Sequence, residues 1–221
     1  TTPVPVHRGG RRRVRAPNTV GHMADVTAAA APVVERRGGL VLTGHRIMVP
    51  LDHDHPSGET IEVYAREVAS ADGGDKPYLV FLQGGPGGES PRPSTAPIGP
   101  GWIARAVRDY RVLLLDQRGT GLSTPVSSSD SRTAQEYADY LANFRADSIV
   151  RDCELLREHL GVERWSLLGQ SFGGFCALNY LSRFPDSLAE VMFTDQLGVE
   201  ELPLEPLGVV VANVGAGRVV I

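Results

Sequence analysis

The stretch WSLLGQSFGG, residues 165–174, is the part of the sequence that decides the fold. It begins with the short apolar run Trp165 to Leu168, and Gly169 to Gly173 then fits the pattern G-x-S-x-G ahead of a helix-like segment. A strand, a tight turn and a helix form the context that an exposed nucleophilic serine requires. A plain turn of small residues between a strand and a helix is the alternative interpretation.

The pattern predicts a role for each residue around this turn. A serine on so tight a turn is strained, and side chains at Gly169 and Gly173 would collide with neighbouring backbone. The turn would lift Ser171 Oγ clear of the sheet, as a nucleophile requires. It would also place the Phe172 N–H at a helix N-terminus, where unpaired donors and the helix dipole favour an anion.

Composition is typical of an ordinary globular protein. The 221 residues are 42% hydrophobic and 22% charged, and the net charge of −4 favours neither nucleic acid nor a membrane as a partner. No apolar run approaches the roughly 18 residues that a membrane span needs. Two isolated cysteines, Cys153 and Cys176, predict reduced thiols in a cytoplasmic protein instead of a disulfide framework.

The chain divides into three regions. Residues 1–32 mix arginine with proline, glycine and alanine and show no apolar periodicity, which predicts a disordered arm. Residues 33–199 have the pattern of a folded domain, and residues 200–221 form a Val/Gly-rich tail of a different character.

Strand-like and helix-like segments alternate within the central region. The expected strands are Leu40–Leu51, Ile61–Val68, Tyr78–Leu82, Val112–Leu115 and Leu188–Thr194. Helices are expected from an N-cap at Asp147 to a stop at Gly161, and over Phe172–Phe184 before Pro185. This alternation predicts an α/β fold, with a mostly parallel sheet and helices on both faces.

A glycine-rich loop, LQGGPGG at residues 82–88, directly follows the strand at Tyr78–Leu82. A phosphate-binding loop would need a Gly-Lys-Ser/Thr ending, which is missing here. A flexible loop remains an alternative. The favoured interpretation is an oxyanion loop, because such a loop follows an earlier strand of sheets with a serine elbow and supplies a second backbone N–H.

A third motif, DQRGTGLS at residues 116–123, leaves the Val112–Leu115 strand at its carboxyl end. Sites of α/β proteins assemble at that edge of the sheet. Asp116 and Arg118 are expected to pair there and to fix the loop beside the elbow. A structural ion pair with no part in chemistry is an equal alternative.

In this order and at these distances, the three motifs resemble the proline iminopeptidases (prolyl aminopeptidases), serine peptidases of the α/β-hydrolase fold that release an N-terminal proline. The resemblance runs from about Leu40 to about Asp195. It implies that Ser171 is the nucleophile and that Phe172 and Gly85 supply the oxyanion-hole N–H groups. It further implies a peptide substrate with a free N-terminal proline and no cofactor.

The other glycines of the loop, Gly84 and Gly87, would support the motif. The family's loop usually opens with histidine, and Gln83 stands at that position here. Because the position shapes the loop and transfers no proton, the change leaves the expected function in place.

No histidine of the chain matches the family's catalytic base. In this fold the triad follows the order Ser, then Asp or Glu, then His. All six histidines precede Ser171: His7, His22, His45, His53, His55 and His159. We therefore assign neither the triad acid nor the histidine, and expect a C-terminally truncated chain without the cap domain and the last strands. The strand Tyr78–Leu82 would then be partly uncovered.

Two upstream groups of histidines are the available substitutes. His159 should end a helix at the sheet edge opposite the elbow, too far away for catalysis. The turn Asp52-His53-Asp54-His55 carries potential metal ligands, but a zinc site needs a further convergent ligand, so a solvated turn and no bound metal are expected.

The sequence therefore supports a serine aminopeptidase that acts through an acyl-enzyme. A truncated, non-catalytic remnant that at most binds a peptide or a partner is the alternative. An esterase or amidase of the same fold is a further alternative, because fold does not fix function.

Overall fold

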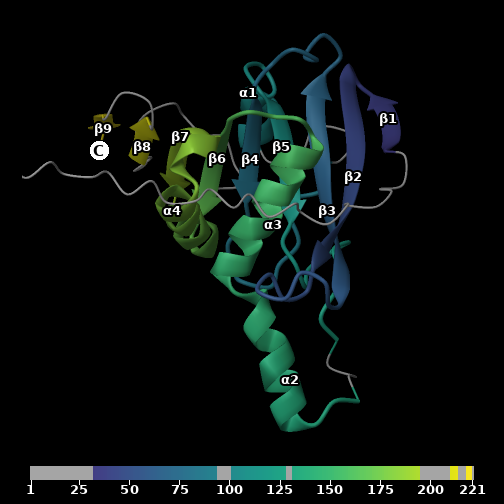
Figure 1. Cartoon of the computed structure of the whole chain (residues 1–221). Helices are drawn as coiled ribbons and strands as arrows, with labels where there is room; N and C mark the ends of the chain where they lie inside the picture. The colour runs from purple at the N-terminus through teal and green to yellow at the C-terminus, as the bar shows by residue number, and fades with distance from the viewer. Residues whose placement is uncertain (1–31, 94–100, 128–130, 195–209, 214–217, 221) are drawn as a thin grey trace, which may run out of the picture.

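The structure is a computed structural model that describes residues 32–93, 101–127, 131–194, 210–213 and 218–220 (Figure 1). Of the last two segments, only the backbone is described. The arm expected at residues 1–32 lies outside the described residues, apart from its last position.

The described residues form a nine-stranded sheet in the order β1-β2-β3-β5-β4-β6-β7-β8-β9. The four central strands β5, β4, β6 and β7 run parallel, and the strands on either side of them pair antiparallel. The strands are β1 (Val33–Arg37), β2 (Leu40–Pro50), β3 (Thr60–Ser70), β4 (Tyr78–Leu82), β5 (Arg111–Asp116), β6 (Trp165–Gln170), β7 (Leu188–Thr194), β8 (Val210–Asn213) and β9 (Arg218–Val220).

Helices cover both faces of the parallel strands, which confirms the predicted α/β fold (Figure 1). One face packs against α1, and the other packs against α3 and α4. The helices are α1 (Gly101–Ala106), α2 (Ala134–Leu141), α3 (Ala146–His159) and α4 (Phe172–Arg183), with short 3₁₀ turns η1 (Ala142–Phe144) and η2 (Pro185–Ser187).

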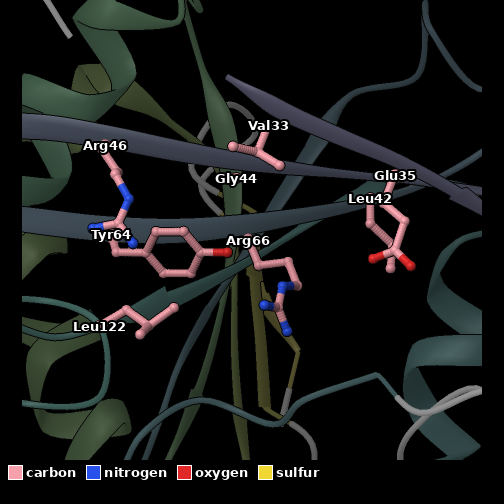
Figure 2. Close-up of a pocket in the computed structure, with 8 residues that line it drawn as sticks. All are labelled: Val33, Glu35, Leu42, Gly44, Arg46, Tyr64, Arg66 and Leu122. Atoms are coloured by element: carbon pink, nitrogen blue, oxygen red, sulfur yellow. The ribbon is translucent and has the colours of Figure 1, made fainter. Parts of the chain in front are cut away.

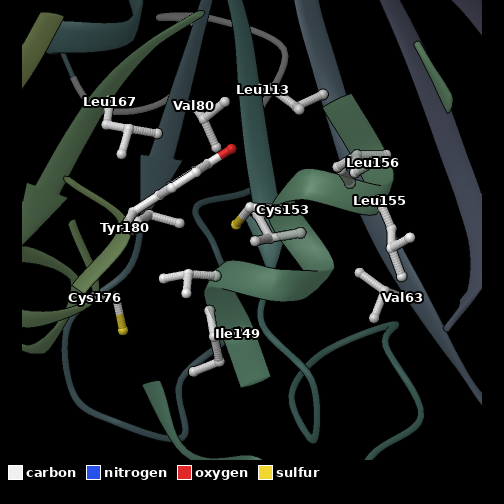
Figure 3. Packing of buried hydrophobic residues seen from close by; sticks show 14 of the residues in the cluster. Val63, Val80, Leu113, Ile149, Cys153, Leu155, Leu156, Leu167, Cys176 and Tyr180 are labelled. Carbon is white, nitrogen blue, oxygen red and sulfur yellow. The ribbon is translucent and has the colours of Figure 1, made fainter. Parts of the chain in front are cut away.

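The central strand β4 shows why the sequences of the central strands are continuous apolar runs. Alternate side chains of a strand point to opposite faces of the sheet. Leu79 and Phe81 therefore pack in the cluster that contains α1, and Val80 and Leu82 pack in the cluster that contains α3 and α4. Figure 3 shows side chains of α3, among them Cys153, pointing toward the strands of that second cluster.

All five residues of β4 are buried, so the expectation of a partly uncovered strand is wrong. The strand is paired with β5 on one side and β6 on the other, and a helical layer lies on each face. Exposed apolar side chains occur instead on α4, where Phe175 is 57% exposed and Leu178 is 54% exposed.

The observed element boundaries match the predicted ones for some elements and differ for others. The strands β4 and β7 have the predicted bounds. Helix α3 begins earlier than expected, because Arg145 is its N-cap and Asp147 lies inside the first turn. A carboxylate there still interacts favourably with the helix dipole. Gly161 adopts φ 65° after the helix, as a glycine stop should.

Some elements were not predicted. Helix α2 begins with a capping box in which Thr133 and Glu136 bond each other's backbone N–H, and this T-x-x-E pattern is visible in the sequence. The strand β1 is exposed along its whole length and lacks the apolar pattern by which strands are recognised.

In the tail, β8 pairs with β7 and β9 pairs with β8, so part of residues 200–221 extends the sheet.

A buried carboxylate on β3 joins residues of three other strands, β2, β4 and β5, at the edge of the sheet where β4 and β5 begin. Glu67 on β3 accepts hydrogen bonds from Arg111 Nε at 2.8 Å and Tyr78 Oη at 3.3 Å, and His45 Nε2 lies 2.9 Å away. Burial by itself would raise the pKa of Glu67, but the hydrogen bonds of His45 and Arg111 outweigh it and lower the pKa. Burial raises the pKa of Tyr78 to about 12.

We expect Glu67→Gln to destabilise the fold at pH 7 by about 1–3 kcal/mol, because the charged acceptor of a buried network is lost. Since the pKa of Glu67 lies below its ordinary 4.5 in the folded state, the stabilisation is complete above 4.5 and is lost as pH falls through the lowered value. Urea unfolding measures the free energy of unfolding of Glu67→Gln and of the exposed control Glu59→Gln. The difference between the two variants should shrink as the pH falls through the lowered pKa of Glu67. A difference that is constant with pH would contradict the assignment.

Candidate functional site: a strained serine turn beside a glycine-rich loop

Ser171 occupies a turn that few side chains tolerate. It joins β6 to α4 with φ 50° and ψ −114°, and no other non-glycine residue in the described part of the chain has a positive φ. The Ser171 N–H donates to the carbonyl of Thr194 at 3.0 Å, which ties the turn to the end of β7. A strained, exposed serine at the carboxyl edge of a parallel sheet is the geometry of a nucleophile elbow.

The flanking glycines are required by close backbone contacts. A Cβ atom at Gly173 would lie 1.9 Å from the carbonyl oxygen of Leu82. A Cβ at Gly169 would lie 2.5 Å from the carbonyl oxygen of Gly173. The collision that the sequence predicts is therefore present at both positions, and it arises because α4 starts directly against the backbone of β4 and β6.

The glycine-rich loop lies against this turn. A Cβ at Gly84 would come within 2.9 Å of the Gln170 carbonyl oxygen and 3.1 Å of Ser171 Cβ. Gly85 and Gly87 adopt φ values of 124° and 99° that favour glycine, and the Gly85–Pro86 peptide bond is cis. The loop after β4 and the serine turn after β6 therefore lie in close contact. An oxyanion loop requires this proximity, and the role itself stays a prediction.

Two backbone N–H groups at this site, those of Phe172 and Gly85, have no hydrogen-bond acceptor among the described residues. Phe172 is the first residue of α4, where N–H groups have no partner within the helix. Among the described residues, neither the Phe172 N–H nor the Gly85 N–H has an acceptor in the protein. Their role as oxyanion-hole donors stays a prediction.

Gln117 is a supporting residue that the sequence did not single out. Its side-chain amide donates to the carbonyl oxygen of Gln83 at 2.9 Å, and the residue is 3% exposed. This bond fixes the start of the glycine-rich loop to the segment that follows β5. The sequence signal for this role is the position of Gln117 within the third motif. A side-chain amide that is buried there needs a hydrogen-bond partner.

The Asp116 carboxylate accepts hydrogen bonds from three residues in two segments of the chain. Its Oδ1 accepts from the Ser90 N–H at 3.0 Å, and its Oδ2 accepts from the Leu122 N–H at 2.8 Å and from Arg92 at 2.5 Å. The residue is fully buried at the end of β5. It thereby holds the chain that follows the glycine-rich loop against the turn of its own motif.

Arg118 has different partners, so the expected Asp116–Arg118 ion pair is wrong. Its guanidinium is fully buried and binds Asp152 of α3, with Nε 2.7 Å from Oδ2. It also donates to the carbonyl oxygens of Leu51 and Asn143, each at 2.8 Å, and of Pro50 at 3.0 Å. The two motif residues point to different neighbours because the chain turns after Asp116. Through these bonds both residues support the loops around the site.

His53 is buried, which corrects the expectation that its whole turn is solvated. Its side chain is 8% exposed, and Nε2 lies 2.8 Å from Asp152 Oδ1 and 2.9 Å from Arg118 Nη2. The neighbouring pair Asp52 and His55 is exposed, and their mutual hydrogen bond lowers the pKa of Asp52 and raises that of His55.

No metal-binding group forms around this turn or elsewhere in the part of the chain that the structure describes. No set of three or more His, Cys, Asp or Glu side chains there converges as metal ligands require.

No described histidine reaches Ser171. His45 is held by Glu67 and His53 by Asp152, and His159 ends α3. Helix α3 leads into the start of β6, and Ser171 follows the end of β6, so His159 lies at the opposite edge. Within the described ranges, Ser171 Oγ has no hydrogen bond to an acid or a histidine. None of the described histidines is therefore bonded to Ser171 as a general base would be, and neither the triad acid nor the base is assigned.

The two cysteines are free, buried and unsuited to nucleophilic attack. Burial raises the pKa of Cys153 far above its ordinary value and that of Cys176 to about 12. A thiol with so high a pKa stays protonated at neutral pH. Ser171 is therefore the candidate nucleophile of the site.

The family model for the alpha/beta hydrolase fold matches residues 77–214, more than half of the chain. The chain belongs to the alpha/beta hydrolase fold family. The matched region includes all three motifs and the strands β4 to β8. No helix in the described residues is both long and apolar enough to cross a membrane.

Curated relatives give a narrower likeness. A proline iminopeptidase of Aeromonas sobria is 54% identical over 162 residues, and one of Aspergillus aculeatus is 41% identical over 159 residues. These alignments cover 71% and 66% of this chain but 37% and 35% of the relatives. The chain thus spans little more than a third of their length.

Solved structures include a proline iminopeptidase-related protein of Thermus thermophilus, with 28% identity and a TM-score of 0.41. That match covers 72% of this chain and 42% of the other.

Gly173→Ala should destabilise the fold by more than about 3 kcal/mol or prevent folding, because its methyl group would overlap the Leu82 carbonyl oxygen. Gly174→Ala is the matched control in the same helical turn, since its Cβ would meet nothing closer than 3.6 Å. That control should be neutral or stabilising by up to about 1 kcal/mol. Equal melting temperatures for the two variants would refute the contact.

Replacement of Ser171 by glycine should stabilise the fold by about 1 kcal/mol relative to Ser171→Ala, because glycine relieves the strain of φ 50° that alanine retains. Both variants lack the hydroxyl, so the comparison isolates the backbone. Chemical denaturation of the two proteins measures the difference. A more stable alanine variant would show that the turn is unstrained.

Proposed function

We propose that this chain carries the nucleophile and the oxyanion loop of a serine aminopeptidase that releases N-terminal proline from peptides. The observation that supports this most strongly is the strained Ser171 beside the loop Gly84–Gly87. The likeness to proline iminopeptidases supports the substrate class. The match to the alpha/beta hydrolase fold, over residues 77–214, includes both segments.

The geometry suits acyl transfer. Ser171 Oγ would attack the carbonyl carbon of the substrate's first residue while its proton passes to a general base. The Phe172 and Gly85 N–H groups would stabilise the oxyanion, and one such donor is typically worth about 10²–10³ in rate. Collapse of the intermediate releases the shortened peptide, with a proton given to its new amine. Water then hydrolyses the acyl-enzyme to free proline and restores the serine.

A non-catalytic role for the chain is the second candidate, and a specific observation favours it. Each of the six histidines precedes Ser171, and none in the described part contacts it. Without a base, a serine hydroxyl is a weak nucleophile. An esterase or amidase is a third candidate, because the same turn and loop would serve esters.

The proposal also includes a cellular compartment and a class of partner. The free thiols of Cys153 and Cys176 support a reducing, cytoplasmic compartment. A peptide is the proposed binding partner. A net charge of −4 gives no reason to expect nucleic acid or a membrane surface.

A fluorophosphonate probe tests the nucleophile, because it reacts only with an activated serine. The proposal predicts labelling of one residue per chain, identified as Ser171 by mass spectrometry, and no labelling of Ser171→Ala. The exposed Ser182→Ala variant serves as the control and should label normally. Absence of labelling in the wild-type chain would support the non-catalytic candidate.

Substrate choice is tested by comparing proline 4-nitroanilide with acetyl-proline 4-nitroanilide and a simple nitrophenyl ester. An aminopeptidase should release nitroaniline only from the compound with a free amine. Cleavage of the ester alone would reject the peptidase and favour an esterase.

A further inference from the structure

A cavity of about 300 Å³ lies on β1, β2 and β3, on the face of the sheet that α1 partly covers (Figure 2). Eight residues line it: Val33, Glu35, Leu42, Gly44, Arg46, Tyr64, Arg66 and Leu122. Neighbouring strands are about 4.8 Å apart, so three strand steps place β3 about 14 Å from β6. The cavity is therefore separate from the Ser171 site and does not depend on the proposed function.

The floor of the cavity is the Tyr64 ring. Gly44 on the neighbouring strand leaves room for the ring, because a Cβ there would lie 3.1 Å from Tyr64 Cε2. The guanidinium carbons of Arg46 and Arg66 lie 4.9 Å and 5.9 Å from the ring centroid. Figure 2 shows the hydroxyl end of Tyr64 directed toward the side where Arg66 stands.

Arg66 differs from the other charged groups around the ring because its charge is not paired. Arg46 forms an ion pair with Glu62, and Arg92, which also approaches the ring, binds Glu89 and Asp116. Within the described residues, Arg66 has no carboxylate partner and no hydrogen bond. Its five N–H donors are therefore available to a ligand.

Two further features define the chemistry of the cavity. The Tyr64 hydroxyl has no hydrogen-bond partner in the described part of the chain, although the residue is only 5% exposed. Val33, Leu42 and Leu122 supply apolar walls. The one carboxylate of the lining, Glu35, is paired with Arg37. The cavity thus combines a free planar cation and a free hydroxyl with apolar surface.

We propose that this cavity binds a small organic carboxylate with an apolar body. The carboxylate accepts two hydrogen bonds from the Arg66 guanidinium, whose planar fork matches it, and one from the Tyr64 hydroxyl. The apolar body lies against Val33, Leu42 and Leu122. The volume is at the lower end of small-molecule sites, so a single ring or a short aliphatic chain fits it.

Benzoate is the probe, and benzamide is its neutral control of nearly the same shape. Ligand-observed NMR titration of the full chain in a low-salt buffer should show benzoate bound at least about tenfold more tightly than benzamide. Arg66→Gln should weaken benzoate about tenfold and Tyr64→Phe about threefold, because each removes hydrogen bonds to a charged group. Arg36→Gln, an exposed position of β1 outside the cavity, should change nothing.

Leu122→Glu gives an independent test if Arg66→Gln fails to fold. Leu122 is 44% exposed, so the change is compatible with folding, and a carboxylate on the cavity wall should abolish benzoate binding by repulsion. Equal binding of benzoate and benzamide overturns the proposal. Equal loss in Arg36→Gln and Arg66→Gln also overturns it, because the binding would then follow net charge alone.

Discussion

Helix α4 begins so close to β4 that the backbone of its first turn touches the backbone of the strand. The contact between Gly173 and the Leu82 carbonyl leaves no room for a Cβ atom, and a similar contact excludes one at Gly169. The chain can pass from β6 into α4 in this space only through a sharp turn, and Ser171 at its tip takes a positive φ. The exposure of the serine hydroxyl is thus a consequence of how tightly a helix packs on a sheet.

A second layer of support comes from the segment after β5. Asp116 holds the chain beyond the glycine-rich loop, Gln117 holds the start of that loop, and Arg118 binds the end of β2 and Asp152 of α3. All three side chains are nearly or fully buried. Because buried polar groups are costly unless they are bonded, three consecutive motif positions with separate partners fix the relative positions of several loops.

Some charged side chains of the molecule are paired inside the protein, and others have no partner of opposite charge among the described residues. Glu67 and Asp152 each neutralise an arginine and engage a histidine inside the protein. Arg66 is the contrasting case, since it lies over Tyr64 in a cavity without a carboxylate partner among the described residues. An arginine left in this way is available to a ligand, whereas the buried pairs are fully used in holding strands and helices together.

The sequence by itself determined the central strands, the serine turn and its glycines. Burial on both faces forces a continuous apolar run such as Tyr78–Leu82, and a strained turn forces small residues at fixed spacing, so both leave local patterns. Only the tertiary structure decided the partners of Asp116, Arg118 and His53, because these bonds join segments up to 99 positions apart. The cavity around Tyr64 likewise arises where three strands and a loop meet, and spacing along one strand does not show it.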